Sequence, residues 1–267
     1  MFPEIVSIGP ASLRSLSVLT AVAFITICFL FWRKGKEEHY ELSELFDVFF
    51  VSWIFGFLAG RAAYIALHQD LFGMQVGKWF DIITYPGFTG LVAIVVAGVY
   101  LYVRARKNEW DSFELLDFFS LAVVNGMVLM YIGQFLDGAG MGHATQLPMG
   151  VLFPGMQEAH HPTQLYLAAS FFIVARLLSK FEYRYRSFSW YRAGKKTAQT
   201  GFLTSVFLLS SGLILFVASM LKPAVFMVSG IGFDPLIAGV LFCTGAWMLF
   251  VRSGRSLQKR KAAPYAA

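Results

Sequence analysis

The stretch FDVFFVSWIFGFLAGRAAYIAL (Phe46–Leu67) is a long apolar run whose two charged residues are Asp47, near its start, and Arg61, near its end. A helix needs about 20 mainly apolar residues to cross the hydrocarbon core of a bilayer. The length of this run therefore predicts a membrane-spanning helix. An arginine inside such a helix costs about 2.5–3.5 kcal/mol on insertion scales, which makes Arg61 a candidate for function.

Six further stretches have the same character. They are Leu16–Trp32, Gly90–Val103, Leu115–Leu136, Gln164–Leu178, Gly201–Leu221 and Pro235–Val251. The composition agrees, because 57% of the 267 residues are hydrophobic and only 14% are charged, against about 25% charged in a typical soluble domain. The sequence predicts an all-α polytopic membrane protein with seven transmembrane helices, built as a single integral membrane domain over residues 1–267.

The connections between these stretches alternate in Lys and Arg content. The first, third and fifth connections and the C-terminal tail are rich in both, whereas the other three together hold only Lys78 and Lys222. The positive-inside rule then places the N-terminus outside and a basic tail, residues 252–267, in the cytoplasm. Because the basic residues are scattered between apolar runs, we expect them to fix topology and contact anionic membrane lipids rather than nucleic acid.

Neither the cysteines nor the histidines form a recognisable framework. Cys28 and Cys243 both lie within apolar runs and predict no disulfide. His143 and the pair His160–His161 do not have the spacing of a metal motif, so no metal site is expected. The N-terminus lacks the basic start and cleavage site of a signal peptide, and we interpret it as mature protein.

The fourth connection, residues 137–163, contains no Lys or Arg and is rich in glycine and apolar residues. We expect it to form an extracytoplasmic loop at the membrane interface, because non-helical backbone at that depth must be buried in protein or line a wet cavity. The loop ends in HHPTQLY (His160–Tyr166). Two interpretations stay open. In the first, the segment is a structural helix start, because Pro162 suits the first turn of a helix. In the second, the polar groups of the segment take part in chemistry.

Other polar residues lie where a bilayer disfavours them. Arg61 and Tyr64 share one helix face, and Arg61 either anchors the helix at the outer headgroups or belongs to a site. Tyr131, Gln134 and Asp137 form a polar stripe at the outer end of the fourth span. Asp117, near the cytoplasmic end of that span, is expected to snorkel to the headgroups.

Together these segments resemble the prolipoprotein diacylglyceryl transferase family. The resemblance extends over nearly the whole chain, in the family's order. It is carried by IVSIGPASLR (Ile5–Arg14), AGRAAY (Ala59–Tyr64), MYIGQFLDGAGMG (Met130–Gly142), LFPG (Leu152–Gly155) and HHPTQLY (His160–Tyr166). The family has seven spans in the same orientation, so the resemblance implies the same fold.

The chain departs from the family at several polar positions. The signature arginine is Tyr131, the signature asparagines are Gln134 and Asp137, and the signature glutamate is Ala139. Phe88 stands where the family's third span has a histidine. Near the end of the sixth span, only Lys222 and Pro223 remain of a pattern with several charged residues.

The resemblance implies a transfer reaction at the outer face of the bacterial cytoplasmic (inner) membrane. A diacylglyceryl group would move from phosphatidylglycerol to the cysteine thiol of a prolipoprotein signal peptide, with no cofactor. The alternative is a catalytically inactive relative that binds lipid or lipoprotein. A small transporter or channel is less favoured, because the sequence shows no clear inverted repeat.

The predicted site follows from this chemistry. A thiol attacks as a thiolate, and histidine exchanges protons near neutral pH, so His161, with His160, is the candidate proton acceptor. Arg61 is the candidate cation for the phosphate, since a guanidinium binds phosphate through two donors at once. Substrate contacts are expected from Tyr64, Tyr131, Gln134, Asp137, Gly142, Gln164, Tyr166 and Lys222.

Overall fold

The computed structural model describes residues 4–8, 11–82, 84–196, 198–223, 227–228 and 231–254. Seven helices of 18 or more residues occur in this part of the chain. They are α1 (Ser15–Glu37), α2 (Leu42–Leu67), α5 (Gly90–Lys107), α6 (Ser112–Asp137), α7 (Thr163–Glu182), α8 (Phe202–Leu221) and α9 (Phe233–Arg252). Every apolar stretch singled out in the sequence forms one of them. Most of the predicted tail, residues 255–267, lies outside the described residues.

Six of these helices are long and apolar enough to cross a membrane, so the chain is a mostly helical, multi-pass membrane protein. The helix outside this set is α5, which has 18 residues and carries Arg104, Arg106 and Lys107 in its last turn. Cations in the last turn of a helix interact favourably with its dipole, but they shorten the apolar part of α5.

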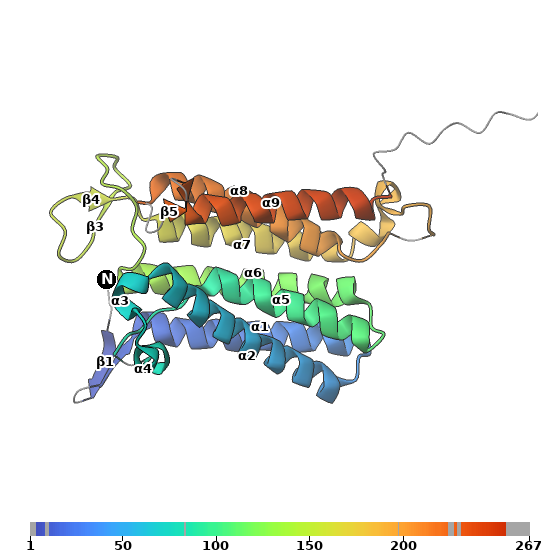
Figure 1. The fold of residues 1–267 in the computed structure, drawn as a ribbon. Helices are drawn as coiled ribbons and strands as arrows, with labels where there is room; N and C mark the ends of the chain where they lie inside the picture. Colours follow the sequence, from blue (N-terminus) through green and yellow to red (C-terminus); the bar gives the residue numbers. More distant parts are fainter. Residues whose placement is uncertain are drawn as a thin grey trace, which may run out of the picture.

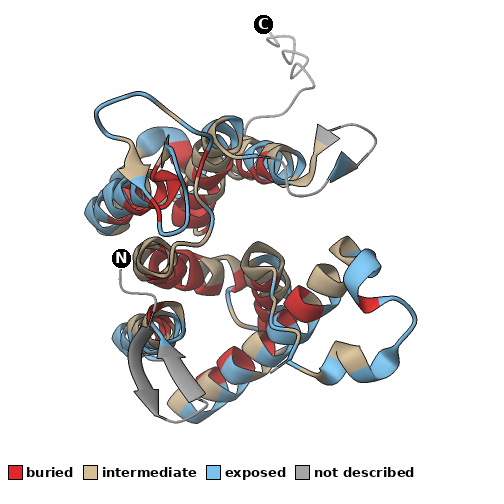
Figure 2. Cartoon of the chain, turned by 90° about the vertical axis from the view of Figure 1, so that its left-hand side faces the viewer, coloured by how far each residue is buried: buried red, intermediate tan, exposed pale blue. Residues whose placement is uncertain are grey.

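The helices form two groups that lie side by side, with α1, α2, α5 and α6 in one and α7, α8 and α9 in the other (Figures 1 and 2). Helix α6 joins the groups, because it packs against α1 and α5 on one side and against α7 and α8 on the other. Its middle is largely buried, as in Leu121, Val123 and Val124. A helix that is apolar all round is expected at such a central position.

Short elements gather at the end of the bundle where α1 begins (Figure 1). Two hairpins pair β1 (Glu4–Ile8) with β2 (Ala11–Arg14) and β3 (Val151–Leu152) with β4 (Ala159–His160). A third pairs β5 (Met227–Val228) with β6 (Ile231–Gly232). The same end holds α3 (Gln69–Phe72) and α4 (Val76–Phe80). Two 3₁₀ turns, η1 (Tyr185–Ser187) and η2 (Ser189–Tyr191), lie in the connection between α7 and α8.

Asp117 does not snorkel, and that prediction is wrong. Its side chain is buried and accepts hydrogen bonds from the backbone N–H groups of Gly201 and Thr204, each at 2.8 Å, and from the Thr204 hydroxyl at 2.7 Å. The first N–H groups of a helix have no partner within the helix. Asp117 therefore supplies acceptors to the start of α8 from within the neighbouring α6.

Candidate functional site

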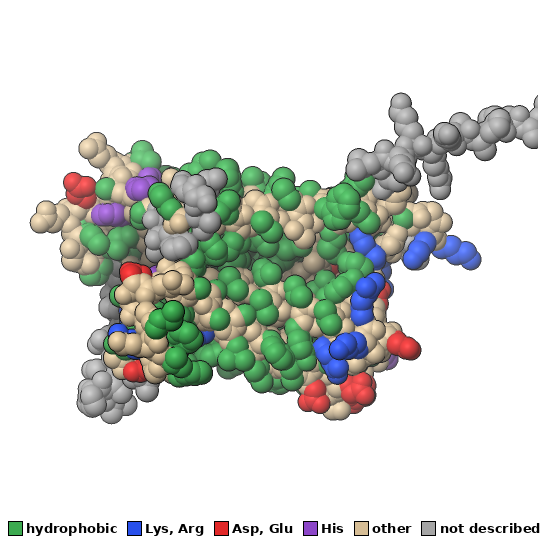
Figure 3. All heavy atoms as spheres, viewed as in Figure 1, with side chains coloured by type: hydrophobic (Ala, Val, Ile, Leu, Met, Phe, Trp, Pro, Cys, Tyr) green, Lys and Arg blue, Asp and Glu red, His purple; other side chains and the backbone are tan. Residues whose placement is uncertain are grey.

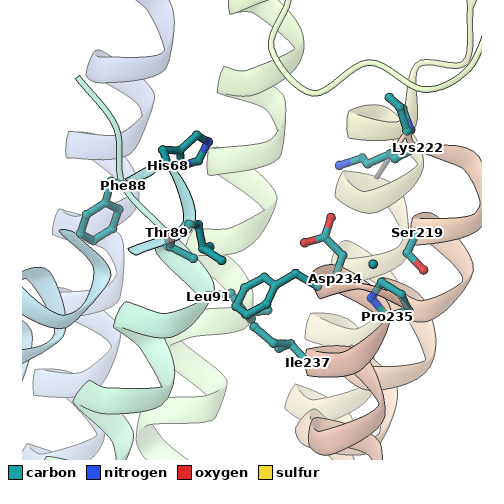
Figure 4. A pocket seen from close by; sticks show the side chains of 14 residues that line it. His68, Phe88, Thr89, Leu91, Ser219, Lys222, Asp234, Pro235 and Ile237 are labelled. Carbon is teal, nitrogen blue, oxygen red and sulfur yellow. The ribbon is translucent and has the colours of Figure 1, made fainter. Parts of the chain in front are cut away.

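A cleft of about 480 Å³ opens between the two helix groups, at the end of the bundle where α1 begins. One wall comes from the end of α2 and the start of α5 and includes His68, Phe88 and Thr89. The other comes from the end of α8 and the start of α9 and includes Lys222 and Asp234 (Figure 4). The cleft thus lies where helices from distant parts of the sequence diverge.

Two charged side chains lie on the same wall of this cleft. Lys222 directly follows α8, and Asp234 lies in the first turn of α9; their side chains extend into the cleft toward one another (Figure 4). Burial lowers the pKa of Lys222, and the negative charge of Asp234 opposes that shift. Among the described residues, no ion pair joins Lys222 or Asp234 to a partner. The cleft therefore offers an ammonium group to an anionic ligand.

Gln134 and Lys222 both lie close to Gly140, in the loop that follows α6. Gly140 in this loop has a φ of +74°, and a Cβ added there would lie 3.7 Å from Gln134 Oε1 and 3.8 Å from Lys222 Nζ. Gly140 therefore lies close to both polar groups, at a φ that residues with a side chain rarely adopt. The structure brings together two predicted substrate contacts that are 88 positions apart in the chain.

The HHPTQLY segment is held by the loop after α6. Thr163 Oγ1 donates to the Gly140 carbonyl at 2.8 Å, and Gln164 Nε2 donates to the Ala139 carbonyl at 2.6 Å. Both side chains are fully buried. The start of α7 is therefore tied to the loop that passes Gln134 and Lys222.

Gly142 continues this attachment by close packing. Its N–H donates to the His161 carbonyl at 2.9 Å. A Cβ at this position would lie 2.6 Å from the Leu221 carbonyl oxygen and 2.8 Å from His161 Cβ, so any side chain would push these segments apart. Gly142 serves here as a packing position between the loop, α7 and the end of α8.

The two histidines of the pair have local partners. His161 Nδ1 lies 3.4 Å from the Tyr166 hydroxyl, and His160 Nδ1 lies 2.9 Å from the Glu158 carbonyl. Neither side chain lines the cleft that holds Lys222. Proton transfer by His161 or His160 stays a prediction.

Arg61 is buried, with 7% of its surface exposed, and its guanidinium points into the connection between α2 and α5. All five N–H donors bind backbone carbonyls, those of Lys78, Trp79, Asp81, Tyr85 and Gly87, at 2.9 to 3.4 Å. The guanidinium carbon also lies 5.1 Å from the centre of the Phe72 ring. Arg61 thus organises the segment that leads to Phe88 and Thr89 on the cleft wall, and it does not itself line the cleft.

The remaining predicted contacts are tyrosines and an aspartate. Tyr64 stacks on His68, with ring centroids 4.1 Å apart, and Tyr131 stacks on Phe171 at 5.5 Å with nearly parallel rings. Asp137 forms a two-point ion pair with Arg14, at 3.0 and 2.8 Å. Of the residues predicted as a site, Lys222 alone lines the cleft, and Gln134 lies beside Gly140, which is also close to Lys222.

The sequence reasoning missed His68 and Asp234. His68 directly follows the last residue of α2, and Asp234 directly precedes Pro235, the first residue of the last apolar stretch. Their position at the ends of predicted spans was the one feature of the sequence that could have indicated them. Without a fold, nothing indicated that these two ends face the same cleft.

A polytopic helical membrane protein with a charged cleft between two helix groups is the class that this fold and site define. Residues 3–251 match the family model described as prolipoprotein diacylglyceryl transferase, and the chain belongs to that family.

Three relatives, from Wolbachia pipientis wMel, Mannheimia succiniciproducens and Aeromonas hydrophila, are each named phosphatidylglycerol–prolipoprotein diacylglyceryl transferase. The first two are each 28% identical to this chain, over 174 and 172 residues. These matches cover 62% and 61% of the chain but only 64% and 62% of the relatives' lengths, which is less than two thirds. The third is 25% identical over 265 residues, 93% of the chain and 89% of the relative.

Proposed function

We propose that the protein transfers a diacylglyceryl group from phosphatidylglycerol to the lipobox cysteine of a prolipoprotein signal peptide. Family membership supports this reaction, because the relatives carry the name of that activity. Family membership and the predicted span further support the proposal that α5 crosses the bacterial inner membrane as a seventh span. The chain then forms one membrane domain over residues 1–267.

The distribution of charge supports an orientation with the N-terminus outside and the tail, residues 252–267, in the cytoplasm. Lys and Arg gather at the end of the bundle where α5 finishes, on the face that Figure 3 shows. The last turns of α1, α5, α7 and α9 all carry basic residues. By the positive-inside rule this end faces the cytoplasm. The loop of residues 137–163 and the cleft then lie at the outer face, the side on which the family resemblance places the reaction.

The observation that carries the proposal is Lys222 in a cleft between helices. In the transfer, the cysteine sulfur bonds to the glyceryl carbon of the lipid, the bond from that carbon to the phosphate oxygen breaks, and glycerol phosphate leaves. The leaving group is anionic, and a fixed cation aimed at developing charge is a large contributor to catalysis. Lys222 supplies that cation, and Gln134 beyond Gly140 supplies a nearby polar contact to the headgroup.

Arg61 was expected to bind the phosphate, and we propose a positioning role for it instead. Because its five donors bind carbonyls, it positions the connection from α2 to α5, which forms one wall of the cleft. Gly142 and Gln164 hold the loop of residues 137–163 against α7 in the same way. Tyr64, Tyr131, Asp137 and Tyr166 stay candidates for substrate contact, and His161 and His160 stay candidates for the proton transfer.

A second candidate function is a non-catalytic relative that binds lipid or lipoprotein. Two observations favour it: the guanidinium of Arg61 is occupied by backbone carbonyls, and Phe88 lies on the cleft wall at the position where the family's third span has a histidine. Such a protein retains phosphatidylglycerol in the cleft without transferring it.

The test is transfer of label from phosphatidylglycerol with a radiolabelled acyl chain to a lipobox peptide, with the full chain in mixed micelles. A peptide with serine in place of the cysteine is the acceptor control. We expect label on the cysteine peptide from the wild type, and a large loss with Lys222→Met. The exposed His143→Gln, whose backbone N–H still binds the Leu221 carbonyl, should behave as wild type. A folded wild-type chain that retains the lipid and labels no peptide would establish the non-catalytic alternative.

A further inference from the structure

His68 lies on the wall of the cleft opposite Lys222. It directly follows the last residue of α2, and its ring is half-buried beside Phe88 and Thr89 (Figure 4). No other histidine lines this cleft among the described residues. A group at this place faces the space in which a lipid phosphate bound to Lys222 would lie.

The hydrogen bond of His68 fixes which of its nitrogens can accept a proton. Nδ1 lies 2.9 Å from the Tyr64 carbonyl oxygen. A carbonyl oxygen can only accept, so Nδ1 carries the proton of the neutral ring and Nε2 keeps a free lone pair. Stacking on Tyr64, with ring centroids 4.1 Å apart, holds the imidazole in this orientation.

We infer that His68 is the residue that takes the proton from the acceptor thiol in the proposed transfer reaction. The inference depends on the proposed function. The S–H proton moves to Nε2, the sulfur bonds to the glyceryl carbon, and the bond from that carbon to the phosphate oxygen breaks. The leaving glycerol phosphate takes the electron pair and stays beside Lys222. The imidazolium then gives its proton to the departing phosphate or to water.

The groups that face His68 come from its own helix and from both walls of the cleft. The Tyr64 and Ile65 carbonyls at the end of α2 accept the His68 N–H, and the C-terminal end of a helix favours a cation. Across the cleft, Asp234 on α9 is an anion and Lys222 is a cation, while the start of α5 contributes uncharged Phe88 and Thr89. Tyr64 is the titratable group that faces the ring from its own helix.

The other candidates fit the role less well. Lys222 must keep its proton to hold a phosphate. Asp234 shares a wall with Lys222, and a carboxylate is generally a much weaker base than a thiolate. His161 and His160 have partners elsewhere, and they do not line the cleft.

The experiment compares a lipobox peptide that carries cysteine with one that carries selenocysteine, whose selenol is already ionised at neutral pH. The donor is phosphatidylglycerol in mixed micelles, and the full-length variants are His68→Gln and His68→Ala. With the cysteine peptide we expect kcat to fall by about 10²–10⁴-fold, the range for loss of a general base. The selenocysteine peptide should recover most of that loss, because it needs no base. His143→Gln, an exposed histidine of the outer loop, is the matched control and should keep the wild-type ratio between the two peptides.

Each other outcome overturns the inference in a distinguishable way. Equal losses with both peptides would mean that His68 only shapes the end of α2. An unchanged rate with cysteine would assign the proton transfer to another group and leave the proposed function intact. A wild-type chain that transfers to neither peptide would overturn the proposed function and the role of His68 together.

Discussion

At the end of the bundle where α1 finishes, buried charged groups have partners, whereas at the opposite end Lys222 and Asp234 face a cleft. Lys34 of α1 forms ion pairs with Glu37 and with Glu182 of α7. Asp117 accepts three hydrogen bonds from the start of α8.

The difference separates polar groups that build the fold from those that are free to bind. A buried charge without a partner is costly, so the partners of Lys34 and Asp117 are needed for stability. A charge that faces a cleft of about 480 Å³ keeps its capacity for a ligand. The polar groups at the end where α1 finishes therefore join helices of the two groups, and those of the cleft are the candidates for chemistry.

The largest effect is expected from removing the cation of the cleft. Lys222→Met should lower kcat for transfer from phosphatidylglycerol by about 10²–10³-fold, the cost of losing one fixed group that stabilises developing charge. Lys222→Arg should restore a large part of the rate. The labelled-peptide assay measures both variants. A Lys222→Met protein with the wild-type rate would break the assignment of the cleft as the reacting site.

At the opposite end, Asp117→Ala should act on stability. The substitution leaves the N–H groups of Gly201 and Thr204 and the Thr204 hydroxyl without their acceptor in a buried place. Loss of one partner of a buried hydrogen bond costs about 1–3 kcal/mol. Thermal unfolding in detergent should show the loss as a lower Tm. The control is Ser210→Ala, since Ser210 bonds only carbonyls of its own helix, and an equal Tm for the two variants would contradict the comparison.

The lengths of the helices and the partners of Asp117 show what the sequence can and cannot predict. The lengths of the apolar runs predict the helices, because the thickness of a bilayer sets the length that each needs. The run expected to end at Leu67 ends there in the structure. The partner of Asp117 is 84 to 87 positions away, and only the packing of α6 against α8 reveals it.

The site was less predictable than the fold for the same reason. Lys222 was found because it stands in a family segment, but His68 and Asp234 belong to no pattern. Arg61 is a charge inside a predicted span, which makes it a candidate for function. Its role was harder to predict, because a guanidinium serves a phosphate and a set of carbonyls equally well. The choice depends on the connection from α2 to α5, whose conformation no local spacing determines.

A smaller effect is expected in Lys222→Arg, on the pH dependence of kcat/KM. Burial lowers the pKa of Lys222, so its ammonium loses the proton at a lower pH than an ordinary lysine does. Phosphate binding by Lys222 is therefore present below that lowered pKa and is lost as the pH rises through it. An arginine stays protonated throughout. In Lys222→Arg the alkaline fall of kcat/KM should move to higher pH, measured from neutral pH upward with the selenocysteine peptide. The same alkaline limb in both proteins would assign that limb to another group.

The smallest effect is expected at the surface of the end where α1 finishes. Arg186 Nη2 lies 2.8 Å from Glu38 Oε1, but the arginine side chain is 53% exposed, so water and salt screen the pair. Exposed ion pairs contribute about 0–1 kcal/mol, and Arg186→Ala should shift Tm far less than Asp117→Ala does. Transfer activity should be unchanged, because Arg186 is remote from the cleft of Lys222. A large loss of Tm would show that this connection between α7 and α8 holds the helix groups together more firmly than its exposure implies. The next residues to substitute would then be Lys34 and its two partners, Glu37 and Glu182.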